Sequence, residues 1–110
     1  MNDVEFEIKS RKIGFHHDPL IIAEIGINHE GSLELAKKMA DLAIDAGVDV
    51  VKHQTHIVED EMSKEADKDV IEYIGKSIYK LMDDCSLSLD EEIELKDYVE
   101  SKGCIYLSTP

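Results

Sequence analysis

The sequence has no tryptophan, two prolines, two cysteines and an aromatic content of only 5%. It is also poor in basic residues: 12 Lys and Arg stand against 25 Asp and Glu, which gives a formal net charge of −13. Phosphate backbones are bound by clustered cations, so we expect no nucleic-acid partner. Cys85 and Cys104 lack CxxC spacing and are too few for a disulfide framework, which predicts free, buried thiols.

Long hydrophobic runs are missing as well. The longest aliphatic stretch, residues 20–23, is far shorter than the roughly 20 apolar residues that span a bilayer. The first residues are acidic and alternating, whereas a secretory signal has a basic start and then an apolar block. We therefore expect no membrane association and a cytoplasmic location. A hydrophobic fraction of 43% is enough to form a folded core.

Apolar segments alternate with helical patterns along most of the chain. A half-buried strand over 3–8 and a second over 11–14 are expected to form a hairpin, so we assign residues 1–18 to this N-terminal unit. The apolar segments 20–26, 48–54 and 104–108 are typical of parallel strands that are covered on both faces. Helical spacing predicts helices over 32–46, 69–83 and 88–102, and residues 55–68 are expected to form a long loop.

The order of these elements favours an α/β fold. Residues 19–110 carry three strands and their intervening helices, and a last strand without a neighbour indicates the start of a larger sheet. We therefore predict the N-terminal portion of a (β/α)₈ TIM barrel, preceded by a short β-hairpin and truncated after the third strand. An open doubly wound sheet is the alternative, but the Gly-rich nucleotide fingerprint after the first strand is missing.

Four polar residues lie where the predicted strands end. They are Glu24, Lys52, Gln54 and Thr109. Side chains alternate between the two faces of a strand, so these four are expected to share one face at the mouth of the barrel. Glu24 and Lys52 could simply neutralise each other, but the cluster could also bind an anion or move protons. Lys52 and Thr109 are suited to phosphate or carboxylate oxygens.

Three histidines, His29, His53 and His56, lie near the same strand ends. Their spacing is unlike that of a helical zinc site, so hydrogen-bonded or substrate-lining roles are favoured over metal binding. The acidic run 59–61 is interpreted as a solvated face.

The sequence resembles the sialic acid (N-acetylneuraminate) synthase family over nearly its whole length. The matching stretches are residues 19–32, 51–63, 98–103 and 107–110, which include Ala-Glu-Ile-Gly-Ile-Asn-His-Glu-Gly-Ser, Lys-His-Gln-Thr-His and Leu-Ser-Thr-Pro. The resemblance implies a barrel that is followed by a small antifreeze-like domain in a domain-swapped homodimer. It also implies condensation of phosphoenolpyruvate with N-acetylmannosamine, with the help of Mn²⁺ or Mg²⁺.

Residue by residue, the resemblance implies a catalytic carboxylate at Glu24. It implies a phosphoenolpyruvate ligand at Lys52, a phosphate contact at Thr109 and a substrate-pocket residue at Gln54. The metal ligands of the family lie on later strands, beyond residue 110, so no metal ligand is expected in this chain.

Three other interpretations stay open. A related nonulosonate synthase would use a modified hexosamine for legionaminate or pseudaminate. A barrel aldolase would use Lys52 as a Schiff-base lysine. The 110 residues by themselves would form a non-catalytic fragment, and we expect them to be inactive alone.

Overall fold

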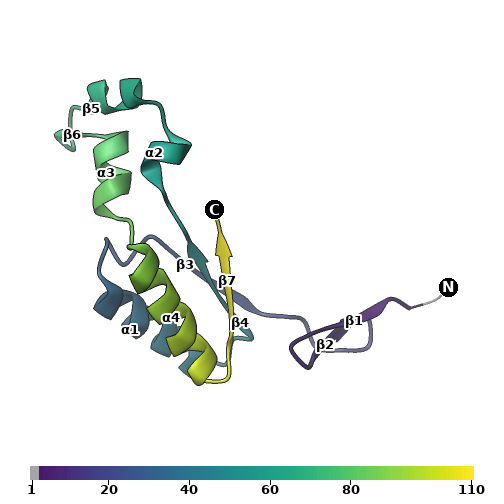
Figure 1. Ribbon diagram of the computed structural model, residues 1–110. Helices are drawn as coiled ribbons and strands as arrows, with labels where there is room; N and C mark the ends of the chain where they lie inside the picture. Colours follow the sequence, from purple (N-terminus) through teal and green to yellow (C-terminus); the bar gives the residue numbers. More distant parts are fainter. Residues whose placement is uncertain (1–2) are drawn as a thin grey trace.

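Three parallel strands form the centre of the structure. In the computed structural model, which describes residues 3–110, they are β3 (Ile22–Gly26), β4 (Val50–Gln54) and β7 (Ile105–Thr109). Their order in the sheet is β3-β4-β7, and all neighbours are parallel. The carboxyl ends of the strands therefore lie at one edge, as the sequence predicts (Figure 1). Each strand begins one or two residues later than expected.

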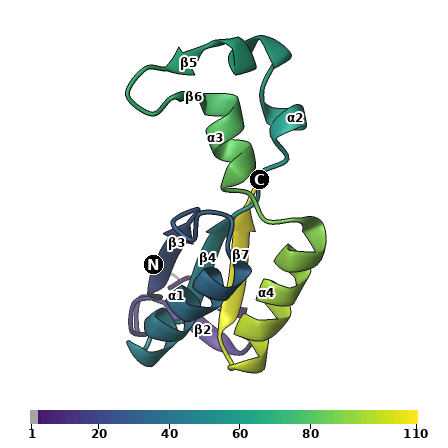
Figure 2. The same cartoon turned by 90° about the vertical axis from the view of Figure 1, so that its left-hand side faces the viewer.

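Two helices cover one face of this sheet. They are α1 (Leu33–Asp45) and α4 (Leu89–Ser101), which lie side by side in front of the strands (Figure 2). Ser32 caps α1, and Ser88 forms a complete capping box with Glu91 at the start of α4. The core between helices and sheet is made by Ile25, Ala36, Ala40, Val51, Leu87, Leu95, Val99 and Cys104. Cys85 and Cys104 are free thiols, but only Cys104 is fully buried.

The other face of the sheet is open. Ile22 of β3 and Leu107 of β7 project from it with 43% and 42% of their surface exposed. The expectation that the strands are covered on both faces is therefore wrong for residues 3–110. No described helix packs over this side, and apolar side chains on it mark where further structure would fit.

The hairpin consists of β1 (Glu5–Ile8) and β2 (Arg11–Gly14), which pair antiparallel. It lies near the amino ends of the central strands (Figure 1). Arg11 holds it there, since its Nε donates to Asp49 Oδ1 at 3.1 Å and Asp49 Oδ2 accepts from the backbone of Ile21. The alternating apolar residues of β1 were expected to be half-buried, but the strand is exposed along its whole length.

The segment between β4 and α4 differs most from the prediction. The expected loop 55–68 contains a short helix, α2 (Val58–Glu61), and a 3-10 turn over Lys64–Lys68. The expected helix 69–83 is reduced to α3 (Ile78–Asp84), because two short paired strands, β5 (Val70–Ile71) and β6 (Lys76–Ser77), precede it. Gly75 turns the chain with φ +73°, and Ser77 caps α3.

This segment, residues 55–88, is called the excursion below, and it lies beyond the carboxyl ends of the strands (Figure 2). Across residues 3–110, the structure holds no helix of the length and apolarity needed to cross a membrane.

Candidate functional site at the strand ends

The four predicted site residues lie together on the open face. Glu24 is in register with Lys52 on the neighbouring strand, and Gln54 is in register with Thr109 on the next. Two-residue alternation places Lys52 and Gln54 on one side of β4, opposite the buried Val51 and His53. The structure thus brings a carboxylate, an ammonium, an amide and a hydroxyl to one edge of the sheet.

Glu24 and Lys52 form an ion pair. Lys52 Nζ lies 2.6 Å from Glu24 Oε1, and the side chains are 28% and 65% exposed. The two residues therefore do contact and neutralise each other, which was one of the two interpretations of this pair. A pair this open to solvent contributes little to stability, so its charges remain available to a ligand that approaches the open face.

Gln54 is linked to the excursion by His56. The ring Nε2 of His56 lies 3.3 Å from Gln54 Oε1, and its Nδ1 lies 2.8 Å from Glu61 Oε2. Glu61 also accepts a hydrogen bond from the backbone N–H of Ile57 through Oε1, at 3.2 Å. Glu61 belongs to the acidic run that is interpreted as a solvated face. The residue is exposed, in agreement with that interpretation, and its carboxylate also contacts His56.

Thr109 ends β7 on the same face, half-buried. Its backbone oxygen accepts a hydrogen bond from the N–H of Thr55 at 2.8 Å, which fixes the end of β7 against the end of β4. On the opposite face, Thr55 Oγ1 and Ser108 Oγ lie 2.6 Å apart. The two strand ends are therefore joined through backbone and side chains.

His29 and His53 lie behind the strands, on the face that the helices cover. Both are fully buried, and their Nε2 atoms are 2.7 Å apart. The N–H of Gly31 donates to His29 Nδ1 at 3.1 Å, so the proton of His29 is on Nε2 and is donated to His53. The proton of His53 is then on Nδ1, which lies 3.0 Å from Glu92 Oε2. These two histidines are hydrogen-bonded core residues and do not face the open side.

Glu92 completes this buried cluster. Tyr106 Oη donates to Glu92 Oε2 at 2.8 Å. Burial by itself raises the pKa of Glu92, but its interactions with His53 and Tyr106 outweigh burial and hold that pKa below its usual range. Burial, with His53 alongside, lowers the pKa of His29, which keeps the imidazole neutral. Burial and the contact with Glu92 raise the pKa of Tyr106.

The sequence carries one signal for Glu92, which lies on the apolar stripe of α4. Glu92, Leu95 and Val99 follow the i, i+3, i+7 spacing of a buried helical stripe, and all three are buried. A carboxylate on such a stripe indicates a buried polar partner. Glu61 offered no comparable signal, because it lies in a run of exposed acids.

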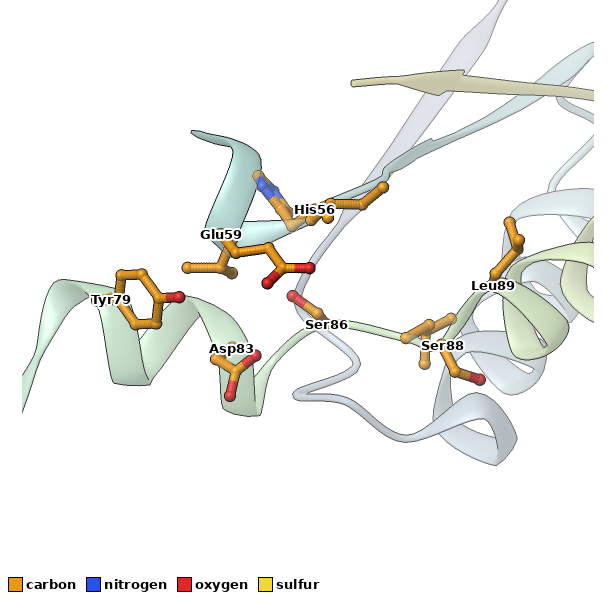
Figure 3. Close-up of a pocket in the computed structure, with 10 residues that line it drawn as sticks. His56, Glu59, Tyr79, Asp83, Ser86, Ser88 and Leu89 are labelled. Atoms are coloured by element: carbon orange, nitrogen blue, oxygen red, sulfur yellow. The ribbon is translucent and has the colours of Figure 1, made fainter. Parts of the chain in front are cut away.

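A cavity of about 490 Å³ lies next to this site, between α2, α3 and the start of α4. His56 and Glu59 lie on one side of it, and Tyr79 and Asp83 of α3 lie across from them (Figure 3). Every ionisable side chain that lines it, apart from the histidine and the tyrosine, is a carboxylate.

The described residues do not form a metal centre. Within 3–110, no three His, Cys, Asp or Glu side chains are grouped closely enough to hold a metal ion. His29 and His53 use their Nε2 atoms on each other, and His56 has a single carboxylate, Glu61, on its ring. A metal held by this chain alone does not fit these side chains.

Comparison with known proteins gives consistent results. The model of the NeuB family matches residues 39–110. An N,N'-diacetyllegionaminic acid synthase from Campylobacter jejuni is 35% identical over 83% of this chain, and the spore coat polysaccharide biosynthesis protein SpsE from Bacillus subtilis is 34% identical over 94%. The solved structure of N-acetylneuraminic acid synthetase from Leptospira borgpetersenii covers 98% of the chain with a TM-score of 0.78 and 28% identity.

The match extends over only part of each relative. The chain spans 28% of the length of the two curated relatives and 34% of the solved synthetase chain. Together with the parallel β3-β4-β7 sheet, this confirms the predicted fold class, an N-terminal portion of a barrel enzyme with a hairpin in front.

Proposed function

Because this chain belongs to the NeuB family, we propose that it supplies the first strands of a nonulosonate synthase that condenses phosphoenolpyruvate with N-acetylmannosamine. The observation that carries the proposal is the meeting of Glu24, Lys52, Gln54 and Thr109 on one open face at the carboxyl ends of three parallel strands. Ligands of parallel α/β folds bind at this edge. The products are N-acetylneuraminate and inorganic phosphate.

In the proposed reaction, C3 of the enolpyruvate attacks the aldehyde carbon of the open-chain sugar. The new C–C bond leaves C2 electron-poor, and the aldehyde oxygen takes up a proton. Water adds to C2 and loses a proton, and the C–O bond to phosphate then breaks. One phosphoenolpyruvate, one sugar and one water are consumed for each phosphate released.

Lys52 and Thr109 are proposed to bind phosphoenolpyruvate. An ammonium on a strand end is a suitable point charge for phosphate or carboxylate oxygens, and a threonine hydroxyl donates to the same atoms. In the free chain Lys52 is neutralised by Glu24 at 2.6 Å. The arriving anion would compete for that ammonium and leave Glu24 free to act elsewhere.

Glu24 is proposed as the catalytic carboxylate, and Gln54 as a contact to the sugar. A carboxylate beside the reacting carbons can accept the proton that water loses and return one to the aldehyde oxygen, which is general acid and base catalysis. The resemblance also implies Mn²⁺ or Mg²⁺, which would polarise the aldehyde. Within residues 3–110, no three His, Cys, Asp or Glu side chains are grouped to hold such an ion. The homodimer likewise stays a prediction.

A modified hexosamine is the second candidate substrate. It is favoured by the legionaminic acid synthase relative, which is 35% identical to this chain. The chemistry at C2 and C3 of the enolpyruvate would be unchanged. Only the acceptor sugar would differ.

The test uses the full-length protein with phosphoenolpyruvate that carries ¹⁸O in the bridge between C2 and phosphorus. With N-acetylmannosamine we expect product formation, and the label should appear in the released phosphate because the C–O bond breaks. The same assay with diacetylated hexosamines ranks the acceptors. Label retained in the sugar acid would mean that the P–O bond breaks and would contradict the proposed step. A borohydride-trapped adduct of pyruvate at Lys52 would contradict the proposal and favour a Schiff-base aldolase.

A further inference from the structure

The side chain of His56 connects Gln54 on the open face to Glu61 in the excursion. Its side chain is 15% exposed, and its two ring nitrogens contact different partners. Nδ1 lies 2.8 Å from Glu61 Oε2, and Nε2 lies 3.3 Å from Gln54 Oε1. A residue two positions after Gln54 therefore reaches back to the amide that we propose as the sugar contact.

The chemistry of these contacts defines the orientation of Gln54. The Glu61 carboxylate only accepts hydrogen bonds, so Nδ1 of His56 donates to it, and the Nε2 side of the ring contacts the Gln54 amide. The Oε1 atom of Gln54 is thereby occupied. Its Nε2 lies on the other side, where a Cβ added to Gly26 would be 3.7 Å away. The two N–H groups of the amide are thus presented at the end of β3.

The position of the His56 ring is fixed by Glu61. Glu61 is itself held in place by the backbone N–H of Ile57 at 3.2 Å, so the carboxylate is fixed before it contacts the ring. Glu59 and Asp83 line the adjoining cavity together with Tyr79, and no lysine or arginine lines it (Figure 3). Glu61, and not these cavity carboxylates, makes the contact with the ring.

From this geometry we propose that His56, held by Glu61, is a positioning residue that turns the Gln54 amide so that its nitrogen donates to an oxygen of the acceptor sugar. The inference rests on the proposed function and adds how that site selects its second substrate. A glutamine free to rotate would offer its oxygen as readily as its nitrogen, and a hydroxyl or acetyl oxygen would then meet a donor only part of the time. Phosphoenolpyruvate, bound by other residues, would not be affected.

The test compares kinetic constants of the full-length protein and its variants. His56→Phe keeps a ring and removes both ring nitrogens. We expect the KM for N-acetylmannosamine to rise about three- to tenfold, which corresponds to the loss of one hydrogen bond. The KM for phosphoenolpyruvate should stay within about twofold. His56→Gln restores one amide donor and should recover part of the loss, and Glu61→Gln should have an intermediate effect.

Glu59→Gln is the matched control. It removes one carboxylate from the same short helix and cavity without touching Gln54, so both KM values should stay unchanged. A His56→Phe protein with an unchanged sugar KM, or one in which both KM values and the melting temperature change together, would overturn the proposal. The second result would mean that His56 only supports the fold.

A measurement that does not depend on turnover separates this inference from the proposed function. In ¹⁵N-labelled full-length protein, Nδ1 of His56 should carry the proton that it donates to Glu61. His56→Phe and Glu61→Gln should shift the side-chain amide signal of Gln54, whereas Glu59→Gln should not. An unshifted Gln54 signal in His56→Phe would overturn the inference even if the enzyme is active. An inactive wild-type protein with these signals intact would instead refute the proposed function.

Discussion

The two faces of β4 both carry polar residues, but these are buried on one face and partly or fully exposed on the other. On the covered face, His53 is fully buried and faces His29 and Glu92. On the open face, Lys52 and Gln54 contact Glu24 and His56 with much of their surface in solvent. Buried polar groups must satisfy one another at once, whereas exposed ones can exchange partners. We infer that the covered face stabilises the strand ends and that the open face performs the chemistry.

Glu24→Gln in the full-length protein tests the open face with the largest expected effect. The change keeps shape and hydrogen bonding but removes proton exchange, so kcat should fall by about 10²–10⁴-fold with little change in either KM. Steady-state kinetics and a melting curve measure this. Glu30→Gln, a nearby loop carboxylate, is the control. Normal kcat together with a changed phosphoenolpyruvate KM would mean that Glu24 only neutralises Lys52.

Glu92→Ala tests the covered face. The change removes the acceptor of Tyr106 Oη and the carboxylate that lies 3.0 Å from His53 Nδ1, and a buried donor left without its acceptor costs about 1–3 kcal/mol. We expect the free energy of unfolding to fall by about 3 kcal/mol in chemical denaturation. Glu94→Ala, an exposed site on the same helix that pairs with Lys37, should cost less than about 1 kcal/mol. Equal losses in both variants would contradict the contrast between the faces.

Lys52→Met removes a charge-assisted contact worth about 1.5–3 kcal/mol. The KM for phosphoenolpyruvate should therefore rise by about 10- to 150-fold, with a much smaller change for the sugar. Lys38→Met, which removes an exposed lysine of α1, gives the baseline. Lys52 is not the anion ligand if the phosphoenolpyruvate kinetics are unchanged.

Mild acid should lower the stability that the buried residues of the covered face contribute, and it should have little effect through the open face. His29 has a lowered pKa in the folded protein, so its contribution is complete above the usual pKa of about 6.5 and is lost as the pH falls toward the folded value. The lowered pKa of Glu92 acts in the same direction at more acidic pH. The melting temperature should drop between pH 7.5 and 5, and His29→Phe should flatten that drop. An equal slope in the variant would exclude His29 as its cause.

The candidate site was more predictable than the segment above it. Alternation along the strands was enough to place Glu24, Lys52, Gln54 and Thr109 on one face, and their registers agree with that expectation. The predicted helix over 69–83 was wrong in its first half, because a few isoleucines at helical spacing are compatible with a short hairpin turned at Gly75. In a short segment, the spacing of a few apolar residues is too weak a signal to distinguish a helix from a hairpin.

Local sequence determined where the two long helices begin and where the parallel strands form. Ser32 and Ser88 cap the helices that they precede, and the apolar segments form the parallel strands. Tertiary structure alone decided that His53 would face a carboxylate. His53 meets Glu92 from 39 positions along the chain, whereas His56 meets Gln54 and Glu61 within five positions. The two-residue alternation along a strand predicts which side chains share a face. It does not predict what covers that face, because the covering residues come from distant segments of the chain.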